Sequence, residues 1–173
     1  VRGPVLRGRR GQPATPLELN KDGAYGIGVD LGWRHICVGS INFHGEVLGS
    51  RVTEFAYPDA TTVADTIAGM VAELVAELPA DRRSRLLDIG VAMPKDFIAD
   101  LDLNGAPTEQ IALWQKLDLK AELAARTGLE VMLLDDGNSG CWAELIALPR
   151  PRPENLLYFL CTDHVAAGVV SGG

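Results

Sequence analysis

Residues 25–42 read YGIGVDLGWRHICVGSIN, and this stretch decides the fold. It begins a series of three strand-like runs, at residues 25–30, 36–42 and 46–55. Gly32 and Trp33 predict a tight turn between the first two runs, and His44 and Gly45 predict a hairpin turn between the last two. Three consecutive strands joined by short turns predict an antiparallel meander.

The rest of the chain alternates helical and strand-like patterns. Residues 61–78 carry apolar side chains at helical spacing, with Thr61 or Thr62 as the expected cap and Pro79 as the end. The later elements are expected to be a strand (86–93), an irregular segment (94–112), a helix (114–127) ended by Gly128, a strand (129–134), a helix (138–148) and two strands (156–160 and 166–170). The order βββαβαβα predicts an α/β lobe, a mixed sheet with helices on its faces, and ligands beyond the carboxyl ends of its strands.

Composition excludes several classes of protein. The chain has 173 residues, 47% of them hydrophobic, and a net charge of −7, so disorder over its whole length is excluded. The most apolar helical stretch is interrupted by Glu73 and Glu77, which argues against a membrane span. The acidic balance argues against DNA wrapping by this segment alone. The chain starts at Val1 and ends in glycines, and we expect it to be part of a longer cytoplasmic protein.

The cysteines and histidines give weak signals. Cys37, Cys141 and Cys161 are widely spaced, which favours small buried side chains in a reducing compartment over a disulfide framework or a structural zinc site. The three histidines, His35, His44 and His164, are far apart, so no metal site is predicted. His44 is expected to be a solvated turn residue. Trp114 and Trp142 are expected in the core, and Trp114 is the better candidate for a ligand platform.

Two segments could carry chemistry. The turn that follows Asp30 could present backbone N–H groups to a phosphate, or could be a plain hairpin with a bulge. Asp135 and Asp136 stand between a strand and a helix, where two adjacent carboxylates repel. Asp136 could be a general base or could accept a hydrogen bond from a polyol hydroxyl. Alternatively, Asp136 or Asn138 could only cap the helix.

Together these motifs resemble the first lobe of the ROK family, which contains sugar kinases and sugar-responsive repressors. The matching runs, in chain order, are Gly26-Ile-Gly-Val-Asp-Leu-Gly32, Gly45-Glu-Val-Leu48, Ile89-Gly-Val-Ala-Met-Pro94, Asp135-Asp-Gly-Asn138 with Ala143-Glu144, Leu156-Leu-Tyr-Phe-Leu160 and Ala167-Gly-Val-Val170. The resemblance implies an actin-like ATPase (ribonuclease H-like) lobe over residues 23–173. It places most of the second lobe, with the family's zinc-binding residues, outside this chain, so no cofactor is expected here.

Residues 1–22 form a basic, Gly- and Pro-rich arm that differs from the rest. Arg2, Arg7, Arg9 and Arg10 are not opposed by an acid until Glu18. The arm is similar to the wing and linker that follow a winged-helix DNA-binding domain in the repressor branch of the family. The resemblance therefore implies DNA binding through a domain preceding residue 1, and a homo-oligomer in the intact protein.

The two phosphate loops of the family kinases are altered in this sequence. Asp30 and Gly32 remain in the first loop, but Trp33, Arg34 and His35 replace its Gly-Thr-Lys. The second loop is glycine-rich in kinases and here reads Thr162-Asp-His-Val-Ala-Ala-Gly168, in which Asp163 would repel a nucleotide phosphate. ATP binding is therefore not expected.

The sugar side of the resemblance is partly preserved. It makes Asp136 the acceptor of a sugar hydroxyl, and the base in a kinase. Asp135 stands where the family has Asn, and Pro94-Lys95 stands where it has Pro-Gly.

We therefore expect the effector-sensing part of a sugar-responsive transcriptional regulator, without kinase activity. The alternative is an ATP-dependent sugar kinase with Asp136 as base and Asp30 organising Mg-ATP. A third possibility is a degenerate lobe, without a ligand, that serves only dimerisation.

Overall fold

The computed structural model describes residues 1–2, 17–162 and 164–172. Within these residues, seven strands and five helices occur in this order: β1 (Tyr25–Leu31), β2 (His35–Asn42), β3 (Val47–Glu54), α1 (Val63–Glu77), α2 (Ala80–Arg83), β4 (Leu86–Met93), α3 (Thr108–Lys116), α4 (Leu119–Thr127), β5 (Glu130–Asp135), α5 (Asp136–Ala147), β6 (Asn155–Cys161) and β7 (Val165–Ser171). None of the helices in this part of the chain has the length and apolarity that a bilayer crossing requires. Most of the basic arm, with Arg7, Arg9 and Arg10, and also Asp163, lies outside the described residues.

A five-stranded mixed sheet has the order β3-β2-β1-β4-β5. The strands β1, β2 and β3 pair antiparallel, as the meander prediction requires, whereas β1–β4 and β4–β5 pair parallel. Gly45 adopts φ 78° in the turn between β2 and β3, a backbone conformation that favours glycine and fits the predicted hairpin. The mixed sheet expected from the sequence is confirmed.

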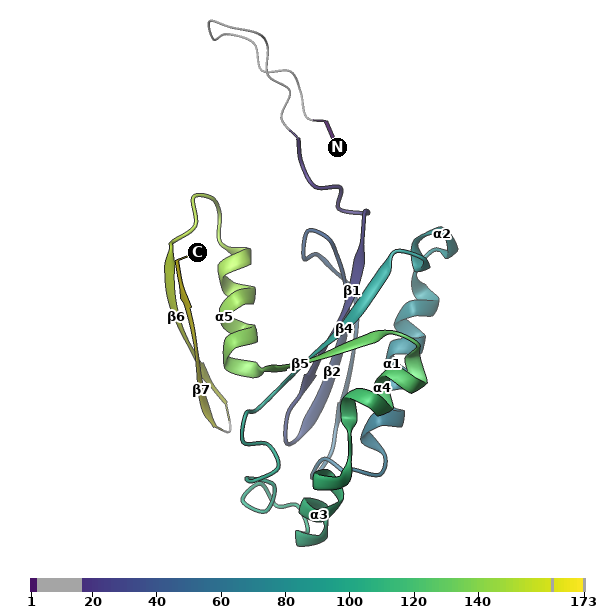
Figure 1. The fold of residues 1–173 in the computed structure, drawn as a ribbon, viewed down its shortest axis with the longest axis vertical. Coiled ribbons are helices and arrows are strands. Elements are labelled where there is room, and N and C mark those ends of the chain that lie inside the picture. Colours follow the sequence, from purple (N-terminus) through teal and green to yellow (C-terminus); the bar gives the residue numbers. More distant parts are fainter. Residues whose placement is uncertain (3–16, 163, 173) are drawn as a thin grey trace, which may run out of the picture.

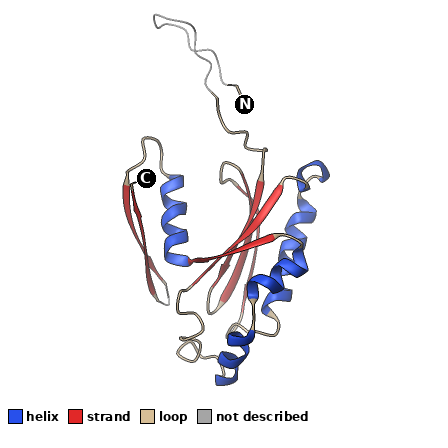
Figure 2. Ribbon diagram, in the orientation of Figure 1, coloured by secondary structure: helices blue, strands red, loops and turns tan. Residues whose placement is uncertain are grey.

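The main core lies between the sheet and the helices α1 and α4, which run along one side of the sheet in Figures 1 and 2. Alternate residues of β1 and β4 face this core, and the apolar stripe of α1 contributes Val63, Ile67, Val71 and Leu74 to the same cluster. The helical periodicity of the sequence therefore identified the buried face of α1.

Helix α5 and the hairpin β6–β7 form a second, smaller packing unit (Figure 1). The helix and the hairpin bury Cys141, Leu145 and Val170 between them. Their backbones approach so closely that a Cβ atom added to Gly137 would lie only 2.6 Å from the carbonyl oxygen of Ala167. A side chain at this contact would separate the helix from the hairpin.

Several local predictions were wrong. The helix expected over 114–127 is two helices, because Asp118 caps a new helix by accepting a hydrogen bond from Ala121 N at 3.0 Å. The first of the two, α3, already begins at Thr108, inside the segment expected to be irregular. By contrast, Thr62 is the N-cap residue of α1, as one of the two predicted alternatives had it, although its side chain makes no capping hydrogen bond.

Burial also differs from expectation at two positions. Trp142, expected in the core, is 49% exposed on α5. Cys161, expected to be buried, is exposed at the end of β6. Both lie in the smaller unit, where the helix and the hairpin cover only one face of each other.

Candidate functional site

The carboxyl ends of three strands meet at one edge of the sheet. In the parallel pairs, Asp30 of β1 lies opposite Ala92 of β4, and Met93 of β4 lies opposite Asp135 of β5. The turn after β1, the loop after β4 and the start of α5 therefore share this edge, as expected for a ligand site in an α/β sheet.

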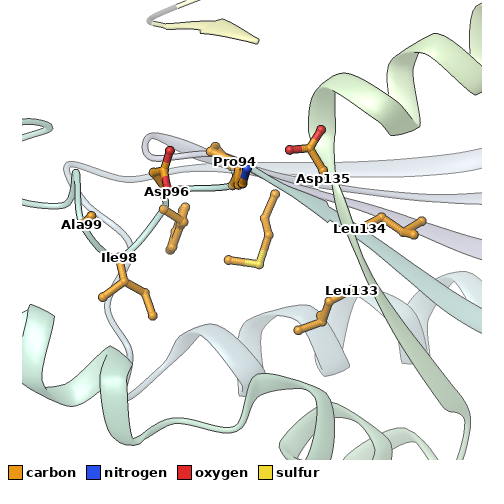
Figure 3. Close-up of a pocket in the computed structure, with 10 residues that line it drawn as sticks. Pro94, Asp96, Ile98, Ala99, Leu133, Leu134 and Asp135 are labelled. Carbon is orange, nitrogen blue, oxygen red and sulfur yellow. The ribbon is translucent and has the colours of Figure 1, made fainter. Parts of the chain in front are cut away.

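Two hollows open at this edge. A cavity of about 290 Å³ is lined by Trp33, Pro94, Lys95, Asp96, Asp100, Asp135, Asp136, His164, Val165, Ala166 and Ala167. A second hollow of about 470 Å³ shares its polar wall, Pro94 to Asp96 and Asp135, and adds Met93, Phe97, Ile98, Ala99, Leu133 and Leu134. In Figure 3 the carboxyl groups of Asp96 and Asp135 lie near its upper rim, and Ile98 and Leu133 lie below them.

Asp136 is the most enclosed acid of the site. It is the first residue of α5 and only 8% exposed. Its Oδ1 accepts a hydrogen bond from its neighbour Gly137 N at 2.7 Å, and its Oδ2 lies 3.0 Å from His164 Nε2. The carboxylate predicted to accept a sugar hydroxyl therefore already has an imidazole partner.

Asp135, the neighbour of Asp136, caps a helix. It is the N-cap of α5, and its Oδ1 accepts a hydrogen bond from Asn138 N at 2.9 Å. The capping residue is thus neither Asp136 nor Asn138, the two alternatives drawn from the sequence. Asp135 still lines both hollows.

Trp33 belongs to the turn between β1 and β2, and its side chain packs into the core. It is 5% exposed, its Nε1 donates to the carbonyl oxygen of Phe97 at 3.2 Å, and its ring is parallel to that of Phe97. Phe97 in turn meets the ring of Trp114 edge-on, with centroids 4.9 Å apart. Trp114 is 2% exposed and donates to Pro58 O, so it is a core residue and not a ligand platform.

The remaining residues of the first altered loop are engaged within the protein. Asp30 Oδ2 lies 3.0 Å from His35 Nε2, in a pair whose side chains are about half exposed. Gly32 N donates to His35 O, so this N–H group is not directed at a ligand. The guanidinium of Arg34 donates to Ala56 O at 3.2 Å. Asp30, Gly32 and Arg34 do not line the 290 Å³ cavity.

The second altered loop closes over the site through His164. Thr162 N donates to His164 O, and Thr162 Oγ1 lies 3.3 Å from His164 Nδ1. Gly168 lies away from this turn and is buried against α5, where an added Cβ atom would lie 2.6 Å from the Cβ of Cys141. Gly168 is therefore a packing residue in this structure, and not part of a phosphate cradle.

Pro94, Lys95, Asp135 and Asp136, the residues predicted to bind a sugar, all line the 290 Å³ cavity. Sequence reasoning made no mention of Asp96 and Asp100, which line the same cavity from a loop without a recognisable pattern, and it treated His164 as one of three isolated histidines. A separation of 28 residues between Asp136 and His164 leaves no local signal for their contact. The only pointer was the place of His164 in the altered second loop.

Cys37 lies opposite Asp30 in the β1–β2 pair. Burial, and then the negative charge of Asp30, raise the pKa of the Cys37 thiol. A raised pKa keeps the thiol protonated near neutral pH and lowers its reactivity. Among the residues that the structure describes, His, Cys, Asp and Glu side chains do not gather in groups of three or more that could hold a metal ion.

Solved structures similar to this chain include both enzymes and a regulator. A ROK hexokinase from Thermus thermophilus matches with TM-score 0.62 and 22% identity over 86% of this chain, and a ROK glucokinase from Streptomyces griseus, in complex with glucose and AMPPNP, matches with TM-score 0.65 and 20% identity over 86%. A ROK transcriptional regulator, a homologue of the E. coli MLC protein, matches with TM-score 0.66 and 21% identity over 95%. No curated protein sequence matches the chain.

This chain spans 47%, 45% and 41% of those three structures, respectively. At these identities the likeness shows a shared fold, and it confirms the actin-like α/β lobe expected from the sequence. The ROK family model matches residues 26–173, from the second residue of β1 to the last residue of the chain. The chain therefore belongs to the ROK family.

Proposed function

We propose that this chain is the sugar-sensing part of a ROK transcriptional regulator that lacks ATP-dependent kinase activity. The observation that carries this proposal is the contact between Asp136 and His164. In a kinase, Asp136 would be the base and would have to take a proton from the sugar hydroxyl. Here its Oδ2 faces an imidazole nitrogen at 3.0 Å, and its side chain is only 7% exposed.

The nucleotide side also favours a regulator. Trp33 occupies the position where the kinases of the family have a glycine, and Arg34, the cation beside it, is hydrogen-bonded to Ala56 O. The close backbone approach of a phosphate at this turn needs the smallest side chain, and Trp33 is the largest.

The sugar side retains acceptors suited to hydroxyl groups. Asp135 and Asp136 line the 290 Å³ cavity with Pro94 and Lys95, and carboxylate oxygens accept hydrogen bonds from several hydroxyls at once. Half of a two-lobed cleft supplies only part of the contacts of a bound sugar. We therefore propose that residues following this chain complete the binding site in the intact protein.

The regulator role implies a mechanism through population shift. A sugar that binds one arrangement of the lobes better than another shifts the equilibrium between them. The basic arm would connect this change to a winged-helix DNA-binding domain in a cytoplasmic homo-oligomer.

The second candidate function is that of an ATP-dependent sugar kinase, which the retention of both Asp30 and Asp136 favours.

The test uses the intact protein and DNA from upstream of its own gene. A gel shift is followed while glucose and other aldohexoses are titrated, and sugar phosphorylation by ATP is assayed in parallel. We expect a shift that one sugar releases or strengthens, and no phosphorylation. Asp136→Asn should retain the shift and lose its response to sugar, whereas Asp30→Asn should retain both. Absence of any shift at low salt, where phosphate contacts are strongest, together with phosphorylation that Asp136→Asn abolishes, would establish the kinase instead.

A further inference from the structure

His164 connects two parts of the molecule at the candidate site. Its Nε2 lies 3.0 Å from Asp136 Oδ2, and its Nδ1 lies 3.3 Å from Thr162 Oγ1. Its ring also meets Trp33 edge-on, with centroids 4.7 Å apart and an interplanar angle of 87°. Asp136 and Thr162 belong to the α5 and β6–β7 unit, whereas Trp33 belongs to the five-stranded sheet.

These contacts give both ring nitrogens of His164 a hydrogen-bonding partner. If Nε2–H donates to Asp136, then Nδ1 is free to accept from the hydroxyl of Thr162. The His164 side chain is 25% exposed and lies between solvent and an acid that is itself 7% exposed.

A ligand that approaches Asp136 Oδ2 from the solvent side has to compete with His164 for space, because the acid's side chain is only 7% exposed and the imidazole lies against it. The other carboxylate oxygen already accepts from Gly137 N at 2.7 Å, inside the first turn of α5. Because the same small ring contacts Asp136, Thr162 and Trp33, displacement of the imidazole from Asp136 also disturbs its contact with Trp33.

We propose that His164 is an internal competitor for the effector at Asp136. On this view, which rests on the sugar-sensing function proposed above, a sugar hydroxyl replaces the imidazole at Oδ2. The displaced ring then loses its contact with Trp33, so occupancy of the site changes how the β6–β7 hairpin is held against the sheet. Sugar affinity is lowered by the fraction of molecules in which His164 covers the acid.

The first measurement needs no sugar. In the intact protein, a double-mutant cycle of Asp136→Ala and His164→Ala measures the coupling of the two side chains in the unfolding equilibrium. We expect a coupling of roughly fivefold or more in the equilibrium constant, because the pair is largely buried. The matched cycle of Asp30→Ala and His35→Ala, a pair of equal length that is half exposed, should give less than about twofold. A coupling for Asp136 and His164 no larger than that of the matched pair would overturn the proposal.

The second measurement is the dissociation constant for glucose and other aldohexoses, by calorimetry, in the wild type, His164→Ala and His35→Ala. We expect His164→Ala to bind the effector several-fold more tightly, or to bind a sugar that the wild type does not, and His35→Ala to match the wild type. Unchanged or weaker binding by His164→Ala would show that His164 is a bystander or a sugar ligand, and the competitor role would fail alone. If neither the wild type nor His164→Ala binds any sugar, the proposed sugar sensing fails, and the competitor role fails with it.

Discussion

Two Asp–His pairs at the same edge of the molecule have the same N–O separation of 3.0 Å and very different surroundings. The pair Asp30–His35 joins residues five positions apart, with side chains 56% and 43% exposed. The pair Asp136–His164 joins residues 28 positions apart, with side chains 7% and 25% exposed. From the N–O distance alone, the two pairs would be expected to interact equally strongly.

Burial decides which of them has a structural effect. An exposed pair competes with water and is screened by salt, so it contributes about 0–1 kcal/mol. A buried pair loses solvation but interacts in a less polar medium, and removal of one partner leaves the other unsatisfied. Each histidine rests on a residue of the turn between β1 and β2, His35 on Gly32 and His164 on Trp33. The first substitution therefore concerns Trp33, the residue that the histidine of the buried pair contacts.

The largest effect is expected from Trp33→Ala. This change removes a side chain that is 5% exposed, with its hydrogen bond to Phe97 O and its contact with His164. A buried Trp→Ala substitution costs about 3–5 kcal/mol, and we expect the free energy of unfolding of the intact protein to fall by that amount in a denaturant titration. Trp142→Ala is the matched control, because Trp142 is 49% exposed. Equal losses for the two variants would contradict the view that Trp33 supports the buried pair.

A smaller effect is expected from Gly168→Ala, which tests how β7 is held against α5. The new methyl group would press on Gly137 O and would lie 2.6 Å from the Cβ of Cys141. Overpacking of this kind costs about 1–3 kcal/mol, and the shift of the hairpin should weaken the contact between His164 and Asp136. Thermal unfolding is the measurement.

Gly69→Ala is the control for that prediction. Gly69 lies in the exposed part of α1, and an added Cβ atom would meet nothing within 4 Å there. Replacement of a helical glycine by alanine stabilises by about 0.5–1 kcal/mol. The same substitution should therefore act with opposite sign at the two positions, and a loss at Gly69 would undermine the assignment of the Gly168 effect to close packing.

The sequence predicted neither Asp–His pair, but it predicted the strands and the turn that carry the local one, for a physical reason. Asp30, Gly32 and the meander follow from alternation and turn residues within one short stretch, and the structure contains all of them. The contact of Asp136 with His164 depends on how α5 packs on β7 across Gly137 and Gly168, which no periodicity encodes. The break between α3 and α4 was missed because the cap at Asp118 outweighs the helical propensity around it.

The same distinction explains the two misplaced side chains. Burial of the α1 stripe could be predicted because the helix lies on a wide sheet. Trp142 and Cys161 lie in a unit of one helix and two strands, where only one face of each element is covered. Composition predicts that such residues prefer the interior, but not which face of a small unit has a partner.

The smallest effect is expected at Cys37, through the charge of Asp30. Burial is the main cause of the raised pKa of this thiol, and the negative charge of Asp30 adds to it. Because Asp30→Asn removes only the second cause, the pKa should fall partway towards its ordinary value, and the thiolate fraction at a given pH should rise. The measurement is the alkylation rate of Cys37 by iodoacetamide between about pH 7 and 9.5, near the ordinary thiol pKa, followed by mass spectrometry of the Cys37 peptide.

We expect the rate profile of Cys37 in Asp30→Asn to move to lower pH than in the wild type, while the exposed Cys161 keeps its own profile in both proteins. Asp96→Asn, which changes an acid on the other side of the site, is the matched control and should leave Cys37 unchanged. If the profile of Cys37 in Asp30→Asn moved no further than in Asp96→Asn, the charge of Asp30 would have no specific effect across the β1–β2 pair. The exposed Asp30–His35 pair would then have no electrostatic effect even on Cys37, its neighbour across the β1–β2 pair. The difference in interaction strength between the exposed pair and the buried pair would then be larger than we expect.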